Sequence, residues 1–497
     1  MKFNIFLIYI IFLVNLAHAQ LFPYLYYGIE EKTIERKIYG DSNLHASVKP
    51  WLILFNEWQQ IDSTRPMVKN KNITAFVKPL LNIETNQNFN QFYQIGTEAL
   101  SSFGKKISLH LSLSQCIIKP DSILIKMYDS IGTWPRWGYV KKNRSVWLHT
   151  HYEGNLFWQA LPYLSFRTGI SRHFLGDGYR SLFLSDNTAP YPYILGIAKI
   201  WKVEYLVLYS FLNEPQWHYF NEIYERKNST LHYLSWNINK RFNINAFETV
   251  IWQVNDSIGY RGFDINYINP FIFFRPIEFS LGSPDNVIMG IGFRYRFFEN
   301  SHLYGQFLLD EFKLNEWKAN NGWWGNKFGF QLGIKTYKLF NSSKWFALLE
   351  CNTVRPFTYT HSDYLSNWGH MHQPMAHPLG ANFIEWISQL AYNTKAWTFS
   401  LQLFYQRQGR SNNTYNAGEN IYWSYNQNRQ EYGYHLLSGA NENLKQVNLR
   451  ISYEISRRLH LKGYIQTIII HKNFETFDQN THLYLNLGIA QTIYNYR

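Results

Sequence analysis

The sequence has only two cysteines and, after its first twenty residues, no long apolar run. Cys116 and Cys351 lie far apart in the chain, so their spacing cannot assign a pairing, and free buried thiols are the simpler interpretation. No later segment approaches the roughly 18 consecutive apolar residues that a membrane-spanning helix needs. The mature chain is therefore not a helical membrane protein.

The one apolar stretch stands at the N-terminus, in MKFNIFLIYIIFLVNLAHAQ. Lys2 precedes a short apolar core, and Ala17-His18-Ala19 forms a small-x-small cleavage site. This pattern predicts a secretory signal peptide over residues 1–19. No cysteine follows the cleavage site, which argues against a lipid anchor there. An exported chain excludes a nucleic-acid partner, and its net charge of +13 suits the anionic lipopolysaccharide of an outer membrane or an acidic polysaccharide.

Aromatic residues make up 19% of the chain, far above ordinary globular usage. Two classes of exported protein fit this composition: a soluble β-rich protein and an outer-membrane β-barrel with aromatic girdles. Period-2 alternation favours the barrel. In LKQVNLRISYEIS, Leu449, Ile451 and Tyr453 share one face, while Arg450 and Ser452 share the other. One apolar and one polar face over about 10 residues is typical of a barrel strand.

Short polar turns and long loops alternate along the chain, as inner turns and outer loops do in an outer-membrane barrel. The pattern predicts an all-β, transmembrane antiparallel β-barrel of about 18 strands. An even count places both termini in the periplasm. Residues 20–70 fit the pattern poorly and are interpreted as a periplasmic N-terminal segment or a plug, and residues 71–497 as the barrel. The predicted strands are 74–83, 91–102, 107–118, 146–159, 164–171, 190–200, 203–212, 230–238, 242–254, 287–298, 302–310, 327–340, 344–353, 384–392, 396–407, 445–455, 459–470 and 482–494.

Three of the long connections, 172–189, 255–286 and 354–383, carry the densest clusters of Gly, Pro, Asp, Asn, Arg and His. The alternation of short and long connections puts all three on the outer side. They are rich in aromatic residues, which water accommodates poorly, so we expect them to fold into the lumen and constrict it.

These loops also carry a resemblance to a known family, in the segments SRHFLGDGYRSLFLSDNTAPYPY, GFDINYINPFIFFRPIEFSLGSPDN and RPFTYTHSDY with QPMAHPLGANF. They are similar, in the same order, to the signature segments of the Wzi-type capsule assembly proteins and the gliding-motility RemB proteins. The match is closer to the RemB-like branch and runs from about residue 70 to the C-terminus. The resemblance implies a barrel of roughly 18 strands, a role in surface polysaccharide or gliding motility, partners from gliding or capsule-export systems, and no reaction.

The stretch GDGYRS could be mistaken for a phosphate-binding loop, but it lacks the Lys and the spacing of a Walker motif. We interpret Gly176 and Gly178 as turn-formers with positive φ, and Asp177 as an acceptor for backbone or Arg donors. Carboxylates of the three loops could form a glycosidase pair. Arginines are present in similar number, so an Arg–carboxylate network that holds the loops, or binds a ligand, is favoured over catalysis. The predicted network comprises Arg172, His173, Asp177, Arg180, Asp186, Asn187, Arg261, Asp264, Arg275, Glu278, Asp285, Asn286, Arg355, His361, His377 and Asn382.

Four histidines, His361, His370, His372 and His377, lie in one loop. Several imidazoles could bind zinc or copper, but no HExxH or cysteine supports them, so a structural role beside Tyr359, Tyr364 and Trp368 is favoured. A Ser–His hydrolase using Ser185 or Ser362 is disfavoured because no GxSxG elbow is present.

Aromatic residues of the outer loops could stack on sugars while neighbouring amides bind hydroxyl groups. The alternative for each is a place in the membrane-interface aromatic belt. The candidates for sugar stacking are Trp323, Trp324 and Trp423.

Together these patterns predict a non-catalytic barrel that binds surface polysaccharide through its outer loops, with no metal and no cofactor. The alternatives are a porin-like channel and, less favoured, an outer-membrane hydrolase.

Overall fold

The computed structural model describes residues 21–24, 45–54, 68–69, 72–87, 91–120, 125, 133–134, 136–143, 145–215, 224–256, 259–262, 264–269, 285–456, 459–474 and 477–491. The predicted signal peptide, residues 1–19, lies outside them. Within the described residues, no helix is long and apolar enough to cross a membrane. Cys116 is buried, Cys351 is half-buried, and both are free, as predicted.

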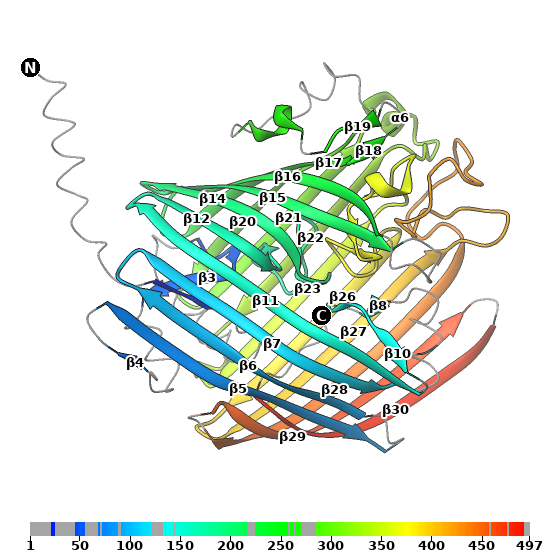
Figure 1. Cartoon of the computed structure of the whole chain (residues 1–497). Coiled ribbons are helices and arrows are strands. Elements are labelled where there is room, and N and C mark those ends of the chain that lie inside the picture. The colour runs from blue at the N-terminus through cyan, green and yellow to red at the C-terminus, as the bar shows by residue number, and fades with distance from the viewer. Residues whose placement is uncertain are drawn as a thin grey trace, which may run out of the picture.

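The chain forms a closed antiparallel β-barrel of 18 strands (Figure 1). Each strand pairs with the next along the chain, and the last closes on the first through Asn486↔Asn86 to Ala490↔Asn82. The short strands β4 (Val68–Lys69) and β10 (Lys141–Asn143) add to the same sheet outside the ring. The barrel strands are β5 (Ile73–Asn86), β6 (Gln91–Phe103), β7 (Ile107–Lys119), β11 (Val146–Leu161), β12 (Leu164–Ser171), β14 (Tyr191–Ile200), β15 (Val203–Pro215), β16 (Tyr224–Asn237), β17 (Phe242–Gln253), β20 (Asn286–Phe298), β21 (Ser301–Glu311), β22 (Lys327–Thr336), β23 (Trp345–Val354), β26 (Phe383–Asn393), β27 (Trp397–Arg410), β28 (Ala440–Ser456), β29 (Leu461–Phe474) and β30 (Phe477–Ala490).

Every predicted strand is present, and the predicted count is confirmed. The largest boundary errors occur at the outer ends. β16 starts at Tyr224 rather than residue 230, and β28 starts at Ala440 rather than residue 445. In both cases the strand continues because its partner does: Pro215 pairs with Tyr224, and Arg410 with Ala440. At these outer ends the side chains no longer alternate between apolar and polar, so the sequence pattern did not predict the extra residues, although their backbones are paired.

The two faces of the strands place the barrel in a membrane. On β28, Leu449, Ile451 and Tyr453 are 44–49% exposed on the outer surface, while Arg450 and Ser452 point inward and are buried. This arrangement is the reverse of a soluble sheet, whose apolar face is covered. Stacked outward-facing aromatic pairs mark the end with short turns, for example Trp158 with Phe166 at 5.7 Å. The chain is an outer-membrane β-barrel, as predicted.

The barrel interior is filled by loops from the outer side. Leu182 and Phe183, from the loop between β12 and β14, are fully buried in one cluster with wall residues such as Leu231 and Phe247. The Phe183 and Phe247 rings stack at 4.8 Å. Trp368 joins the same cluster and donates a hydrogen bond from its indole nitrogen to the carbonyl of Phe183 at 2.8 Å. The expected inward folding is thus observed for the loops 172–189 and 354–383.

A segment before the barrel, residues 45–50, also lies in the interior. Its strand β2 (Val48–Lys49) pairs with β13 (Phe174–Leu175) of the loop between β12 and β14. His45 contacts the Ser235 hydroxyl of the wall at 2.8 Å, and both side chains are buried. The first of these contacts ties the N-terminal segment to the loop 172–189, and the second ties it to the wall. Most of the predicted domain 20–70 lies outside the described residues, so its periplasmic part stays a prediction.

Candidate functional site

The turn that contains GDGYRS is clamped by one wall glutamate, Glu350 of β23. Its carboxylate accepts the backbone N–H groups of Tyr179, at 2.7 Å, and Arg180, at 3.0 Å, and also the Tyr304 hydroxyl at 2.7 Å. The backbone donors that would cradle a phosphate are therefore already bound to a carboxylate. The turn interpretation fits this geometry, and a nucleotide loop does not.

The two glycines of this turn serve different purposes. Gly176 has φ +150°, which L side chains rarely adopt, as expected. Gly178 does not have a positive φ, and the expectation that it would was wrong. It is needed because a Cβ there would lie 2.5 Å from the Glu350 carboxylate and 2.8 Å from the carbonyl of Arg180. Close approach to the wall, not backbone conformation, requires this glycine.

Next to the turn, Arg180 forms a buried two-point ion pair with Glu385 of β26. Its Nη2 and Nε lie 2.9 and 3.1 Å from the two carboxylate oxygens. The Nε2 of His377 contacts the same carboxylate at 2.6 Å. Burial lowers the pKa of His377, opposed by Glu385. Burial also acts to lower the pKa of Arg180, but the Glu385 carboxylate outweighs it and the net pKa is raised. The site holds one positive and one negative charge with a neutral imidazole.

Other polar residues of the loop 172–189 are also tied down. Arg172 pairs with Glu153 of β11 at 2.7 Å, and Asp177 with Arg294 of β20 at 3.3 Å. Further contacts join this loop to neighbouring segments: Asp186 to Arg136 at 2.8 Å, the Asn187 amide to the carbonyl of Pro374 at 3.2 Å, and His173 to the Tyr191 hydroxyl at 3.1 Å. The polar residues that the sequence singled out in this loop are therefore paired, and their ion-pair partners Glu153, Arg294 and Glu385 lie on barrel strands.

The second predicted loop forms a separate group at the outer end of β17 and β20. Arg261 binds both Asp264 and Asp285 at 2.7 Å, which opposes the effect of burial and raises the pKa of its guanidinium. Asn286 donates to the carbonyl of Ser366 at 2.9 Å. These residues are not brought into contact with Arg180. Two further predicted residues, Arg275 and Glu278, lie outside the described residues.

Predicted residues of the third loop anchor the outer connection 411–439. The Asn382 amide donates to the carbonyls of Ala417 and Ser438, and its oxygen accepts the N–H of Leu437 at 2.8 Å. Arg355 donates to the carbonyl of Tyr434 at 3.2 Å. These bonds join one outer connection to another.

The four clustered histidines make separate ring contacts. Each packs on a different ring, and the predicted neighbours Tyr359, Tyr364 and Trp368 are not among them. The sequence predicted hydrogen bonds or stacking on those three rings, and these ring contacts are made elsewhere. The ring pairs are His361 with Tyr425, His370 with Tyr191, His372 with Tyr422, and His377 with Phe383. Across the described part of the chain, no group of three or more His, Cys, Asp or Glu side chains could hold a metal ion.

The tryptophans expected to stack on sugars are largely covered. Trp323 and Trp324 are 8% and 9% exposed, and the expectation that they are open was wrong. The Arg429 guanidinium lies 3.7 Å from the Trp324 ring centre, and the Lys313 ammonium lies 4.4 Å from the Trp323 ring centre. Cation–π contacts occupy the ring faces that a sugar would need. Trp423 is half-buried.

Sequence reasoning missed the wall residues that hold the loops. Glu153, Glu214, Glu350 and Glu385 all lie within strands and point inward. Lys227 of β16 is fully buried and pairs with Glu214 at 3.0 Å. The sequence did hold a signal for them, because an acidic residue on the polar face of a barrel strand points into the lumen. There a loop or another strand must supply its partner, as Arg180 does for Glu385 and Lys227 for Glu214.

Acid is expected to loosen the loop that contains His370 and His372. Burial, and to a lesser extent Lys227, lowers the pKa of His370 to about 3 and that of His372 to about 4. Both folded pKa values lie below the ordinary 6.5, so this stability is present above pH 6.5 and is lost as pH falls toward the folded values. The loss is about 1.4 kcal/mol per pH unit for each histidine. Hydrogen exchange of residues 369–376 should accelerate between pH 7 and pH 5, after correction for intrinsic rates. An unchanged corrected rate would contradict the assignment.

Comparison with known proteins shows the fold alone. No family model matches the chain, and no curated protein matches it. Among solved structures, it is similar to Wzi, an outer-membrane protein involved in group 1 capsule assembly in Escherichia coli and described as a carbohydrate-binding β-barrel. The two share 13% identity with a TM-score of 0.58 over 95% of this chain and 99% of Wzi. The outer-membrane protein OprD from Pseudomonas aeruginosa matches at 10% identity with a TM-score of 0.44, over 88% of this chain and 99% of OprD. The likeness to Wzi agrees with the closed outer-membrane β-barrel described above.

Proposed function

We propose that this protein is a non-catalytic outer-membrane barrel that holds surface polysaccharide at its outer face, in a capsule-assembly or gliding system. The observation that carries the proposal is the filled lumen. The loop 172–189 is held to the wall by the buried pairs Arg180–Glu385 and Arg172–Glu153, and its apolar residues form a core with wall residues. A lumen organised in this way serves as a scaffold for outer loops. The carbohydrate-binding barrel Wzi, which shares the fold, supports the same proposal.

The charged groups of the loops support a binding role over a catalytic one. A glycosidase needs one carboxylic acid and one carboxylate that both face the sugar. Here Asp177, Asp186 and Asp285 each form an ion pair with an arginine. These groups are engaged in holding the loops, which is the role the proposal gives them.

The polysaccharide contact proposed here is an amide-rich outer face on the connection 411–439. Amide groups bind sugar hydroxyls as donors and as acceptors, and an aromatic ring packs on the C–H face of a sugar. The exposed residues that define this face are Asn412, Asn413, Asn426, Gln427, Asn428, Gln430 and Tyr432.

A binding measurement tests the proposal. The purified barrel is titrated with surface polysaccharide extracted from the producing cells, alongside the variant Asn412→Ala/Gln427→Ala/Tyr432→Ala. Loss of two amide contacts and one aromatic contact should weaken binding at least tenfold, about 1.4 kcal/mol. The matched control, Asn300→Ala/Lys344→Ala on the inner turns, should bind like the wild type. If the barrel binds no polysaccharide, the proposed polysaccharide contact is wrong, and a protein partner for the outer loops is favoured.

The channel alternative has its own measurement. A porin-like barrel would show steady single-channel conductance in planar bilayers, whereas a filled lumen should pass little current. Sustained open-porin currents from the wild-type protein would overturn the scaffold proposal.

A further inference from the structure

The barrel wall has a break in its ladder near the outer side. β12 and β14 are short, so the wall between β11 and β15 ends at the pairs Gly154↔Ile170 and Ser171↔Tyr191 (Figure 1). Beyond this point, residues 149–153 of β11 pair with β7 on one edge, and no described strand pairs with their other edge. Two missing strands leave three strand spacings, or about 14 Å, between β11 and β15.

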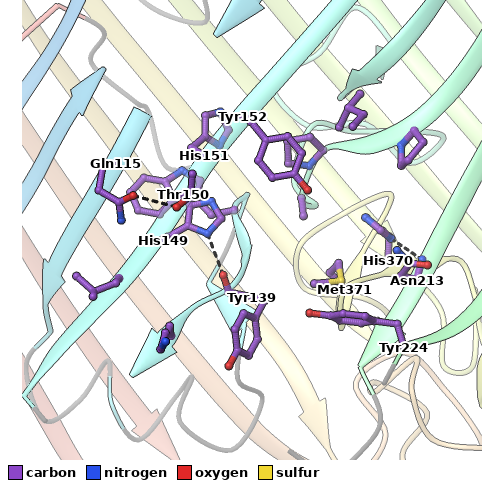
Figure 2. A pocket seen from close by; sticks show the side chains of 17 residues that line it. Gln115, Tyr139, His149, Thr150, His151, Tyr152, Asn213, Tyr224, His370 and Met371 are labelled. Atoms are coloured by element: carbon purple, nitrogen blue, oxygen red, sulfur yellow. Dashed lines mark hydrogen bonds between the residues drawn. The ribbon is translucent and has the colours of Figure 1, made fainter. Parts of the chain in front are cut away.

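A cavity of about 530 Å³ lies at this break. Figure 2 shows Thr150 and Tyr152 of β11 on one side, and Asn213 of β15 and Tyr224 of β16 on the other. The backbone edge of β15 is partly covered from inside, because the N–H of Met371 donates to the carbonyl of Asn213 at 2.8 Å. We call this cavity the wall niche.

The wall niche is entered from the membrane-facing surface. Tyr152 is 56% exposed, and its outward neighbours Thr150 and Gln115 are also exposed. Tyr152 stands six residues from Trp158, which marks the inner girdle, and a tilted strand rises about 2.5 Å per residue along the membrane normal. That places Tyr152 about 15 Å above the inner girdle of an apolar band about 25 Å tall. The entrance therefore lies at the depth of the outer leaflet.

The floor of the wall niche combines rings with unpaired polar atoms. His149 stacks on Trp137 at 5.4 Å with an interplanar angle of 12°, and its Nδ1 lies 2.9 Å from the carbonyl oxygen of Tyr139. The Nε2 of His149 and the Nδ1 of His151 are buried without a hydrogen-bond partner in the described part of the chain. These imidazoles add polar groups to the rings that line the wall niche.

We propose that the wall niche is a lateral binding site for a glycolipid of the outer leaflet. The entry depth requires a ligand from the membrane, and a lining of rings, imidazoles and an amide fits a sugar headgroup better than a plain acyl chain. Leu148 and Ile170 on the rim offer an apolar path for the acyl chain. The exposed Lys141 at the outer edge suits an anionic group on the headgroup. This site goes beyond the proposed polysaccharide role and does not depend on it.

Native mass spectrometry of the detergent-solubilised full-length barrel tests the site, with lipid A as the probe. The wild type should retain one lipid A more tightly than phosphatidylglycerol. Thr150→Trp fills the entrance from an exposed position, and His149→Phe keeps the ring stack but removes both imidazole nitrogens, including the Nδ1 that contacts the carbonyl of Tyr139. Both variants should weaken retention of lipid A at least tenfold.

Matched controls lie on the lipid-facing side of β29, at Thr467→Trp and His471→Phe. Thr467 is half-exposed, and the side chain of His471 forms a hydrogen bond with the Thr481 hydroxyl at 2.9 Å. Both controls should retain lipid A like the wild type, with all four variants folding in equal yield. Equal retention of phosphatidylglycerol, an equal loss in the Thr467→Trp control, or displacement of lipid A by soluble surface polysaccharide would each overturn the proposal.

Discussion

Glu385→Ala is expected to release the loop 172–189 from the barrel wall while the barrel itself stays folded. The substitution removes the carboxylate that binds Arg180 at two points and His377 at 2.6 Å. All three side chains are buried, so the guanidinium would be left as an uncompensated charge in the interior. Breaking a buried pair by removing one partner costs about 3–5 kcal/mol. That cost falls on the opening of the loop, because the eighteen-strand ladder does not depend on this contact.

Limited proteolysis at residues 172–189, compared with heat-modifiable migration of the barrel in gels, separates the two effects. The loop should become cleavable and the migration should be unchanged. Glu442→Ala is the matched control, since Glu442 is also a strand glutamate with two cationic partners, Arg410 and Lys472. Those partners are 38% and 30% exposed, so the control should cost under about 1 kcal/mol. Equal protection of the loop in Glu385→Ala and wild type would contradict this account of the clamp.

The strands could be predicted because the membrane imposes a local rule. Each strand must present an apolar face to lipid, so alternation appears wherever the chain crosses, as in Leu449 and Ile451. Turn and loop lengths then assign sides, which is why the loops 172–189 and 354–383 were expected outside and are found folded in from that side. The outer strand ends were mispredicted because water-exposed pairing, as at Tyr224, follows no such rule.

The contacts inside the barrel could not be predicted, because they join positions far apart in the chain. Arg180 and Glu385 are separated by 205 residues, and only the closed ring brings them together. Residue type indicated that an arginine network would form, and parity placed Glu385 on an inner face, but neither supplies a distance. The burial of Trp323 and Trp324 could not be predicted for the same reason. Their sequence neighbours suggested exposure, whereas Arg429, which is distant in sequence, covers the ring of Trp324.

The break in the barrel wall could be predicted only in part from the sequence. The short segments 164–171 and 190–200 were predicted at nearly their observed lengths. Because these two strands are short, strand pairing between β11 and β15 stops before the outer ends of both. Length alone does not show that the long edges of β11 and β15 flank a cavity, since a loop could have covered both edges. The cavity and the unpaired nitrogens of His149 and His151 could be found only in three dimensions.

Gly178→Val is expected to displace the turn that fills the lumen and to let current through the barrel. A Cβ at this position would lie 2.5 Å from Glu350 and 3.0 Å from the Gln331 amide nitrogen. Overpacking of a filled interior costs about 1–3 kcal/mol. Displacing the turn also removes the N–H groups of Tyr179 and Arg180 from the Glu350 carboxylate, which leaves a buried acceptor undersatisfied at about 1–3 kcal/mol more. The wild type should be silent in planar bilayers, and the variant should show repeated openings.

Gly196→Val is the matched control for this experiment. Gly196 lies on β14, and its nearest neighbour to an added Cβ is the Phe166 ring at 3.7 Å, an ordinary contact. The control should therefore fold and stay silent, so that a current in Gly178→Val reports the turn and not the substitution of glycine as such. If the wild type conducts as freely as Gly178→Val, the loops do not seal the lumen, and the porin-like channel is favoured over the scaffold proposal. A silent Gly178→Val with unchanged protease resistance would instead mean that the wall yields to the added side chain, and that the turn is held by its apolar contacts with Leu231 and Phe247 more than by Glu350.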